Sequence, residues 1–382
     1  MSVPTPSWRP LSPAERAVAI EVLTNGPLSR SAIARRLGMS GGSLTRLAKP
    51  LIDAGLLVEG PTTPADRGRP GQPLDIVTGP WHFVGLKITA DALYAVVTTL
   101  KSEVVRRETR PLTDRDPDAV AGLAHAVVSE LAEEYPRLAG IGVGVGGRTA
   151  DRSVVTESSF LDWHDVPFAE LLEQRTKLPV VIDNDVAALV EAETWFGAGR
   201  GLDRFAVLTL GAGVGYSLVL GGTPVRPSDE GRAASRYWIV DPTGPVTPEG
   251  QRGSAVSMLS IPAIEYQVHA ATGSRVPYAD ILERARAGDP LTSRVVQDAG
   301  RALGALLAQI ATFALPEKIL LAGEGVGLVD AAGDTVADTL AAHRHPAATP
   351  VPLETRVSDF HDWARGAAVL AIQVLVLGGR EA

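Results

Sequence analysis

The sequence predicts an α/β protein: a small N-terminal winged helix-turn-helix followed by a body of two α/β lobes. Short, capped helices stand near the start of the chain. Buried apolar strands that end in glycine loops then alternate with amphipathic helices. The 382 residues, 45% of them hydrophobic, are enough for two or three packed domains. We expect boundaries at 1–78, 79–200 and 201–382, with the C-terminal helix packing back on the first lobe.

Charge is distributed unevenly along the chain. The segment up to Val77 holds nine basic and six acidic side chains, a net charge of +3, although the whole chain carries −8. The remainder therefore carries −11. A small basic head on a large acidic body is typical of a nucleic-acid-binding module joined to a domain with another role.

Composition excludes several classes of protein. There is no cysteine, so disulfides and thiolate metal sites are excluded. The first residues lack the pattern of a secretory leader, and no uncharged apolar run reaches the roughly 20 residues of a membrane span. We therefore expect a soluble, cytoplasmic protein.

Capping residues mark three short helices near the N-terminus. A serine precedes each helix, and a glycine follows the second and the third, at Ser12, Ser29, Ser40, Gly38 and Gly55. The second and third helices, joined by a tight turn, form the helix-turn-helix pattern, whose second member enters the major groove. Pro50 lies inside the third helix, where we expect a kink or an early end.

Candidate DNA contacts lie on the third helix and on a wing that follows it. Leu44, Leu47 and Leu51 form the inward stripe of the helix, so the opposite face can meet bases and phosphates. The wing contains an Arg-Gly-Arg-Pro loop that suits a narrow minor groove, and a solvated charged loop is the alternative. The candidate DNA-binding residues are Ser40, Ser43, Thr45, Arg46, Lys49, Arg67 and Arg69.

The body reads as two α/β units in series. The first has three strands within residues 82–110, an amphipathic helix after Asp116, and two buried strands, LAGIGVGVGG and LPVVIDND. The strand LPVVIDND ends in polar residues at its carboxyl end, where open α/β sheets bind ligands. The second unit has a glycine-turned hairpin from Phe205, a long helix around Leu303, a strand EKILLAGEGVG and an apolar helix around Val369. Most residues of these two helices are expected in the core, with a dimer surface as the alternative.

These segments together resemble the ROK family (repressors, open reading frames and sugar kinases), including the winged helix of its repressor branch. The resemblance is carried in order by LTRLAKPLIDAGLL, GIGVGVGG, VVIDNDVAA, LTLGAGVG, IVDPTGP, PEKILLAGEGV and RGAAVLA. It implies a two-lobed, actin-like ATPase-type fold of the sugar kinase/ROK kind. By the family pattern Asp185 would be the general base toward a sugar hydroxyl, Asn184 would bind another hydroxyl, and the loop at Gly146 would line the site. The alternative is that Asp185 only caps the following helix.

The phosphate side departs from the family pattern. Lys87 stands where the resemblance implies a metal-associated aspartate, and Thr89 replaces a glycine in the same loop. Ala212 replaces the threonine common in the second glycine loop. Phosphoryl transfer needs a metal and oriented donors at the phosphates. We therefore expect no catalytic residues and no cofactor.

The family's zinc segment is altered as well. By spacing from IVDPTGP, Tyr237 stands at the zinc histidine, Ala234 at a sugar-binding glutamate, and Thr247, Glu249 and Ser254 at the cysteines. Such a set does not suit structural zinc, and His343 and His345 are expected in a loop. Phe160 occupies a position that is often asparagine, and Arg236 or Tyr237 could supply replacement contacts.

The sequence thus predicts a DNA-binding transcriptional regulator, a repressor of genes for sugar or amino-sugar uptake or catabolism. Its partners would be double-stranded operator DNA, a sugar, amino sugar or sugar phosphate as effector, and further copies of itself in a homodimer or homotetramer. Three alternatives stay open. They are an active sugar kinase, a body that only dimerises and binds no ligand, and a regulator controlled by a protein partner.

Overall fold

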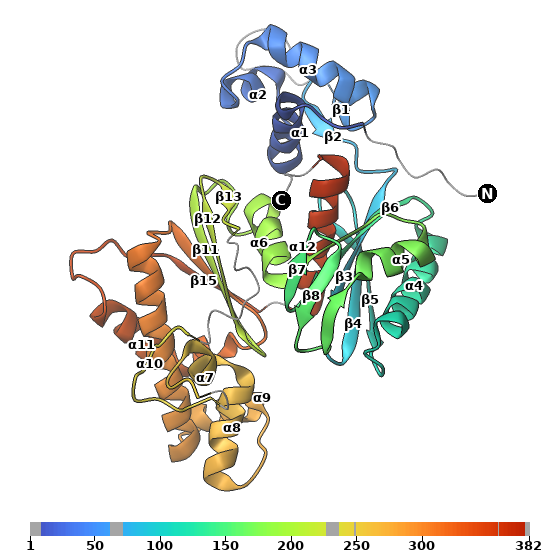
Figure 1. The fold of residues 1–382 in the computed structure, drawn as a ribbon. Coiled ribbons are helices and arrows are strands. Elements are labelled where there is room, and N and C mark those ends of the chain that lie inside the picture. The colour runs from blue at the N-terminus through green and yellow to red at the C-terminus, as the bar shows by residue number, and fades with distance from the viewer. Residues whose placement is uncertain (1–8, 62–71, 227–236, 248–249, 358, 379–382) are drawn as a thin grey trace. The chain divides into compact units, whose positions relative to one another are not determined.

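A computed structural model describes residues 9–61, 72–226, 237–247, 250–357 and 359–378. The chain forms two compact units, Met1–Phe196 with Phe360–Ala382, and Gly197–Asp359. Figure 1 shows the elements of both. The fold class expected from the sequence is confirmed: a helical head with a small sheet precedes two lobes, each built on a mixed sheet. Among the described residues no helix is long and apolar enough to span a membrane.

The head consists of three helices and a two-stranded sheet, α1 (Pro13–Asn25), α2 (Arg30–Arg36), α3 (Gly41–Asp53), β1 (Leu57–Glu59) and β2 (Leu74–Ile76). Ser12, Ser29 and Ser40 each cap a helix, since each side chain accepts a hydrogen bond from a backbone N–H in the first turn. β1 and β2 pair antiparallel, as a wing requires. The helix α3 does not end early at Pro50; it continues to Asp53, close enough to its C-terminus to tolerate the lost donor.

The first lobe is built on a five-stranded sheet of order β10-β6-β3-β4-β5. Its strands are β3 (His82–Ile88), β4 (Ala92–Thr98), β5 (Val104–Pro111), β6 (Leu138–Val145) and β10 (Val180–Asn184). β3 pairs parallel with β6, and β6 with β10. A separate antiparallel sheet holds β7 (Arg148–Ala150), β8 (Val154–Ser158) and β9 (Trp163–Val166).

Helices cover both faces of this sheet. The core on one face includes α4 (Pro117–Glu134) and α5 (Phe168–Thr176). On the other, α12 (Phe360–Ala371) packs on β3, β4 and β6 and against α6 (Asp185–Phe196). Gly85 and Gly142 make this approach possible, because a Cβ at either would overlap the backbone of α12. A π-helical turn, η2 (Ile372–Val376), continues α12.

The head shares a hydrophobic core with the first lobe. Buried side chains of α1, α2 and α3 lie in one cluster with Phe83 of β3, Ile372 and Val376 of η2, and Leu377. Arg16 of α1 donates from Nε to the carbonyl oxygen of Leu377 at 2.7 Å. The head is therefore packed on the end of the C-terminal helix.

The second unit has a sheet of order β13-β12-β11-β14-β15. Its strands are β11 (Arg204–Leu210), β12 (Val214–Leu220), β13 (Thr223–Pro224), β14 (Lys318–Ala322) and β15 (Leu353–Arg356). Its helices are α7 (Ala255–Leu259), α8 (Ile261–Thr272), α9 (Tyr278–Arg286), α10 (Pro290–Phe313) and α11 (Gly327–Ala342). Leu303 of α10 is buried in the core of this unit, and Val369 of α12 is buried in the first.

Candidate functional site

The outer face of α3 carries the candidate DNA contacts. Thr45, Arg46 and Lys49 are exposed, whereas Leu44 and Leu51 are fully buried on the opposite side. This division follows from the 3.6-residue period of a helix anchored by its leucines. The helix therefore presents two long cationic side chains to solvent within its first three turns.

The hydroxyl groups predicted to contact DNA already have partners in α3. The Ser40 hydroxyl accepts a hydrogen bond from the Ser43 backbone N–H at 3.1 Å and donates one to the Ser43 hydroxyl. Thr45 donates to the carbonyl oxygen of Gly41 at 3.0 Å. These three side chains set the start of the helix, which leaves Arg46 and Lys49 as its strongest candidates. Arg67 and Arg69 lie outside the described residues.

An ion pair supports the first helix of the head. The Glu15 carboxylate accepts hydrogen bonds from Arg9, from the Ser12 hydroxyl and from the Ser12 backbone N–H, which completes a capping box. The Arg9 guanidinium, followed by the Ser12 backbone N–H, lowers the pKa of Glu15 to about 2. The carboxylate is therefore charged at neutral pH and fixes the start of α1.

Asn184 and Asp185 lie where β10 ends and α6 begins. The Asn184 side-chain oxygen accepts from the backbone N–H groups of Val186 and Ala187, at 3.0 and 3.2 Å. Its amide nitrogen donates to the carbonyl oxygen of Gly147 at 2.8 Å. Asn184 therefore caps α6 and ties down the glycine loop. Capping, which the sequence offered as an alternative role for Asp185, is performed chiefly by its neighbour.

Lys87 forms an ion pair with Asp185. Its Nζ contacts Asp185 Oδ2, and the two side chains are only 7% and 15% exposed. The alternation of β3 places Lys87 on the same sheet face as Gly85, the face that α12 covers. Trp363 of α12 brings its ring to 5.5 Å from Nζ. Sequence reasoning identified both ionic residues, but not their contact and not Trp363.

Phe160 and Gly146 complete this site in the first unit. A Cβ built on Gly146 would lie about 3 Å from the Phe160 ring and 3.4 Å from Asp185 Oδ2. A larger residue at this position would make the Phe160 ring shift by a few tenths of an ångström, so glycine gives the loop its close approach to both side chains. The Phe160 side chain is half exposed. The structure thus brings the three candidate effector residues together and adds Lys87 and Phe160.

In the second unit, a carboxylate occupies the glycine loop that follows β11. Glu324 Oε1 accepts from the backbone N–H of Ala212 at 3.0 Å and lies against Gly211. Backbone N–H groups of such loops are the donors that a nucleotide phosphate uses. A negative side chain on this donor disfavours a phosphate there. The glycine run was visible in the sequence, but the blocking residue, 112 positions further on, was not.

The segment at the family's zinc position is held by other interactions. Ser254 is fully buried and caps α7, and the Thr247 hydroxyl donates to Gln251 at 2.7 Å. Tyr237 is 70% exposed. These side chains offer hydroxyl oxygens rather than the imidazole and thiolate donors of a structural zinc site, and Ala234, Arg236 and Glu249 lie outside the described residues. The residues present do not fit a zinc ion.

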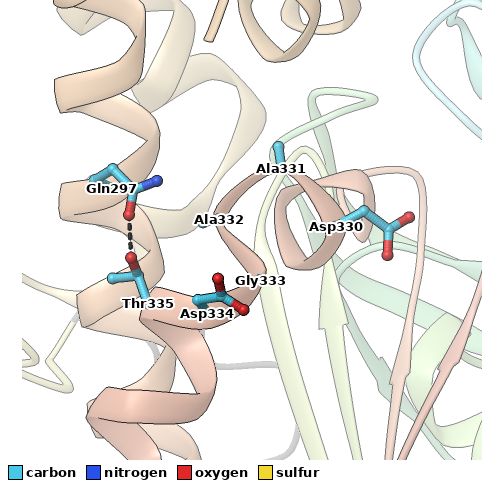
Figure 2. Close-up of a pocket in the computed structure, with 7 residues that line it drawn as sticks. All are labelled: Gln297, Asp330, Ala331, Ala332, Gly333, Asp334 and Thr335. Atoms are coloured by element: carbon cyan, nitrogen blue, oxygen red, sulfur yellow. Dashed lines mark hydrogen bonds between the residues drawn. The ribbon is translucent and has the colours of Figure 1, made fainter. Parts of the chain in front are cut away.

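Two surface hollows lie elsewhere. One, of about 250 Å³, is lined by Gln297 of α10 and by residues 330–335 of α11. Figure 2 shows these residues and the hydrogen bond that Thr335 donates to Gln297. The other, of about 600 Å³, lies beside Trp163 in the first unit. Neither hollow is lined by Lys87, Asn184 or Asp185. The candidate effector site is therefore defined by the contacts among its side chains and not by either hollow.

Two groups of known proteins resemble this chain, transcriptional regulators and sugar kinases. The DNA-binding transcriptional repressor Mlc of Escherichia coli is 24% identical over 338 residues, which is 84% of this chain and 83% of Mlc. A glucokinase of Halalkalibacterium halodurans is 27% identical over 325 residues, which is 78% of this chain and 93% of the kinase.

A solved structure extends the likeness to the head. The crystal structure of a ROK family transcriptional regulator, a homolog of the E. coli Mlc protein, is 24% identical to this chain. It superposes with a TM-score of 0.79 over 96% of both chains. The fold likeness thus includes the N-terminal helices. Residues 83–374 match the ROK family, and the chain therefore belongs to it.

Proposed function

We propose that this protein is a DNA-binding transcriptional regulator, a repressor of genes for sugar or amino-sugar uptake or catabolism, with an effector-sensing and dimerising body. The exposed face of α3, with Arg46 and Lys49 opposite the fully buried Leu44 and Leu51, is the observation that carries the proposal. A helix of this kind, followed by a wing, has the geometry of a major-groove reader. The name of the relative Mlc, a DNA-binding transcriptional repressor, supports a regulatory role. So does that of the N-acetylglucosamine repressor of Escherichia coli O6:H1, which is 25% identical over 313 residues, 78% of this chain and 77% of the repressor.

Two charged contacts argue against a sugar kinase. A general base must accept a proton from the substrate hydroxyl, but Asp185 is paired with Lys87. The phosphate loop carries the Glu324 carboxylate on a backbone donor. The first contact neutralises the carboxylate that would act as the base, and the second places a negative charge where a negatively charged phosphate would bind. The glucokinase relatives therefore share the family, whereas the proposed role here is regulation.

A series of contacts connects the candidate effector site to the head. Asp185 opens α6, and Glu191 in the same helix accepts a buried hydrogen bond from Gln373 of η2 at 2.8 Å. Four residues after Gln373, Leu377 accepts from Arg16 of α1. Ligand binding that moves α6 thus has a physical route to the DNA-reading helices. In a homodimer, such movement would change the spacing of the two recognition helices.

A duplex selected from a random library tests the DNA-binding role. We expect Arg46→Ala to weaken binding by about 1–3 kcal/mol, the usual worth of a major-groove contact. Arg294→Ala, an exposed arginine on α10, is the matched control and should bind as the wild type does. Equal affinity of all three proteins at moderate salt would rule out this recognition face.

Thermal melting against hexoses, amino sugars, their phosphates and ATP tests the effector role. A ligand well above its Kd should raise stability by about 2–4 kcal/mol. Asp185→Ala should keep DNA affinity and lose the response to that ligand. If no sugar shifts the melting temperature, the body binds no sugar effector and serves only dimerisation or a protein partner.

A further inference from the structure

The polar atoms that a ligand hydroxyl would reach at the Asn184-Asp185 pair are already bonded within the chain. Lys87 contacts Asp185 Oδ2, and the Val186 backbone N–H donates to Oδ1 at 2.9 Å. The Asn184 side-chain oxygen receives two backbone N–H groups. Exchanging one hydrogen-bond partner for another stabilises a buried polar group little, because the net free energy is that of the new bond less that of the bond it replaces. A ligand hydroxyl that takes the position of the ammonium beside Asp185 Oδ2 must therefore replace an existing bond.

Lys87 is held at Asp185 by the surrounding fold. Its residue is 5% exposed, on a strand with neighbours on both sides. Across from it on β6 stands Gly144, which has no side chain, and the Trp363 ring lies over the ammonium. A buried ammonium and a buried carboxylate each need the other, because an unpaired charge away from water is costly. The ion pair thus leaves neither buried charge unpaired when no ligand is bound.

We propose that Lys87 is a built-in occupant of the effector site and decides what the site accepts. Its ammonium holds the place beside Asp185 Oδ2 that a ligand hydroxyl takes, and a ligand binds only by exchange with it. This inference rests on the proposed effector function and assigns its specificity to one residue. Exchange lowers the affinity of the wild type, so removing the ammonium while keeping Asp185 strengthens binding of a neutral sugar.

The occupant itself is tested by chemical rescue. Lys87→Ala retains Cβ, so the missing atoms correspond to n-propylammonium. We expect n-propylammonium chloride, compared with sodium chloride at equal ionic strength, to raise the melting temperature of this variant only. Lys318→Ala is the matched control, since Lys318 pairs with Glu354 at 2.9 Å in the second unit and is more exposed. Equal effects of both salts on Lys87→Ala, or an equal rise in Lys318→Ala, overturn the proposal.

Exchange is tested with D-glucose, D-mannose and D-xylose by calorimetry. We expect Lys87→Met to bind at least one of them with a Kd about 10- to 100-fold lower than the wild type, the worth of a hydrogen bond to a charged group. Lys87→Met/Asp185→Asn should lose this gain. The calorimetric experiment also tests the proposal if Lys87→Ala does not fold, because methionine keeps an apolar side chain of nearly the length of lysine in the buried position.

Two results overturn the exchange. One is wild-type affinity equal to or higher than that of Lys87→Met, which would make Lys87 a ligand contact. The other is no sugar binding by either protein. Failure of the proposed DNA-binding role is recognised separately, because it appears as absent DNA binding by the wild type and leaves the rescue by n-propylammonium unaffected.

Discussion

At the scale of single residues, the Lys87–Asp185 ion pair has the clearest energetic consequence. Breaking a buried pair typically costs 3–5 kcal/mol, because the remaining charge has no partner, whereas removing both charges costs far less. We expect Lys87→Met to lower the free energy of unfolding by about this amount, and Lys87→Met/Asp185→Asn to recover most of it. Urea unfolding followed by circular dichroism measures both. Lys318→Met, with a half-exposed partner, should cost about 0–1 kcal/mol. Additive effects of the two site substitutions would contradict this account.

The site also shows how far sequence can specify residues. Lys87, Asn184 and Asp185 could each be named from motifs, because their neighbours in the chain fix the strand ends on which they lie. Their contacts could not be named, since Lys87 and Asp185 are 98 positions apart and meet only after β3 and β10 join the same sheet. That the Asn184 oxygen caps α6 was not predicted, and the reason for this contact is local. At the start of a helix, backbone N–H groups compete for its oxygen.

At the scale of elements, the cap of α1 gives a pH dependence. The pKa of Glu15, lowered to about 2 in the folded state, lies below its ordinary value. A lowered carboxyl pKa contributes stability above the unfolded value and loses it as pH falls, here between about pH 4.5 and pH 2. We expect the midpoint of urea unfolding to fall as pH is lowered through this window. Arg9→Gln should narrow the pH range over which stability is lost, because Arg9 is the main cause of the lowered pKa of Glu15. An unchanged pH profile in Arg9→Gln would contradict this assignment.

The contact between α1 and the C-terminal segment yields a second prediction for elements. Arg16→Ala removes the hydrogen bond to Leu377 and leaves the outer face of α3 intact. We expect DNA affinity without effector to stay within about twofold of the wild type. The effector-induced change in affinity, typically worth 1–3 kcal/mol, should shrink. Fluorescence anisotropy with and without effector measures this, and Arg294→Ala is the control. A full response in Arg16→Ala would exclude this route.

Elements with local signals could be predicted, and elements without them could not. The three helices of the head were marked by serine caps, the third also by periodic leucines, and the core strands of both lobes by apolar runs. The small sheet β7–β8–β9 has short strands with polar faces, so its pattern resembles a loop. The alternating glycines of β6 were read as a strand, but their role against α12 depends on a helix more than 200 residues away.

At the scale of the whole molecule, charge distribution predicts how DNA binding responds to salt. The net charge of −8 would oppose binding if it were spread evenly, but the first 77 residues carry +3. Binding to DNA releases about 0.9 counterions for each phosphate contacted, so the logarithm of affinity falls linearly with the logarithm of salt. For the proposed DNA-binding role, the slope therefore counts the phosphate contacts of the head.

We expect the full-length protein to show a steep negative slope in spite of its acidic body. Lys49→Ala, which removes a single exposed charge from α3, should reduce the slope by about one unit. Arg294→Ala changes the net charge by the same amount on the second unit and should leave the slope unchanged, because screening confines surface charges to about 10 Å at 0.1 M salt. Anisotropy titrations between about 50 and 200 mM salt measure all three slopes. If both substitutions changed the slope equally, net charge rather than the face of α3 would govern binding.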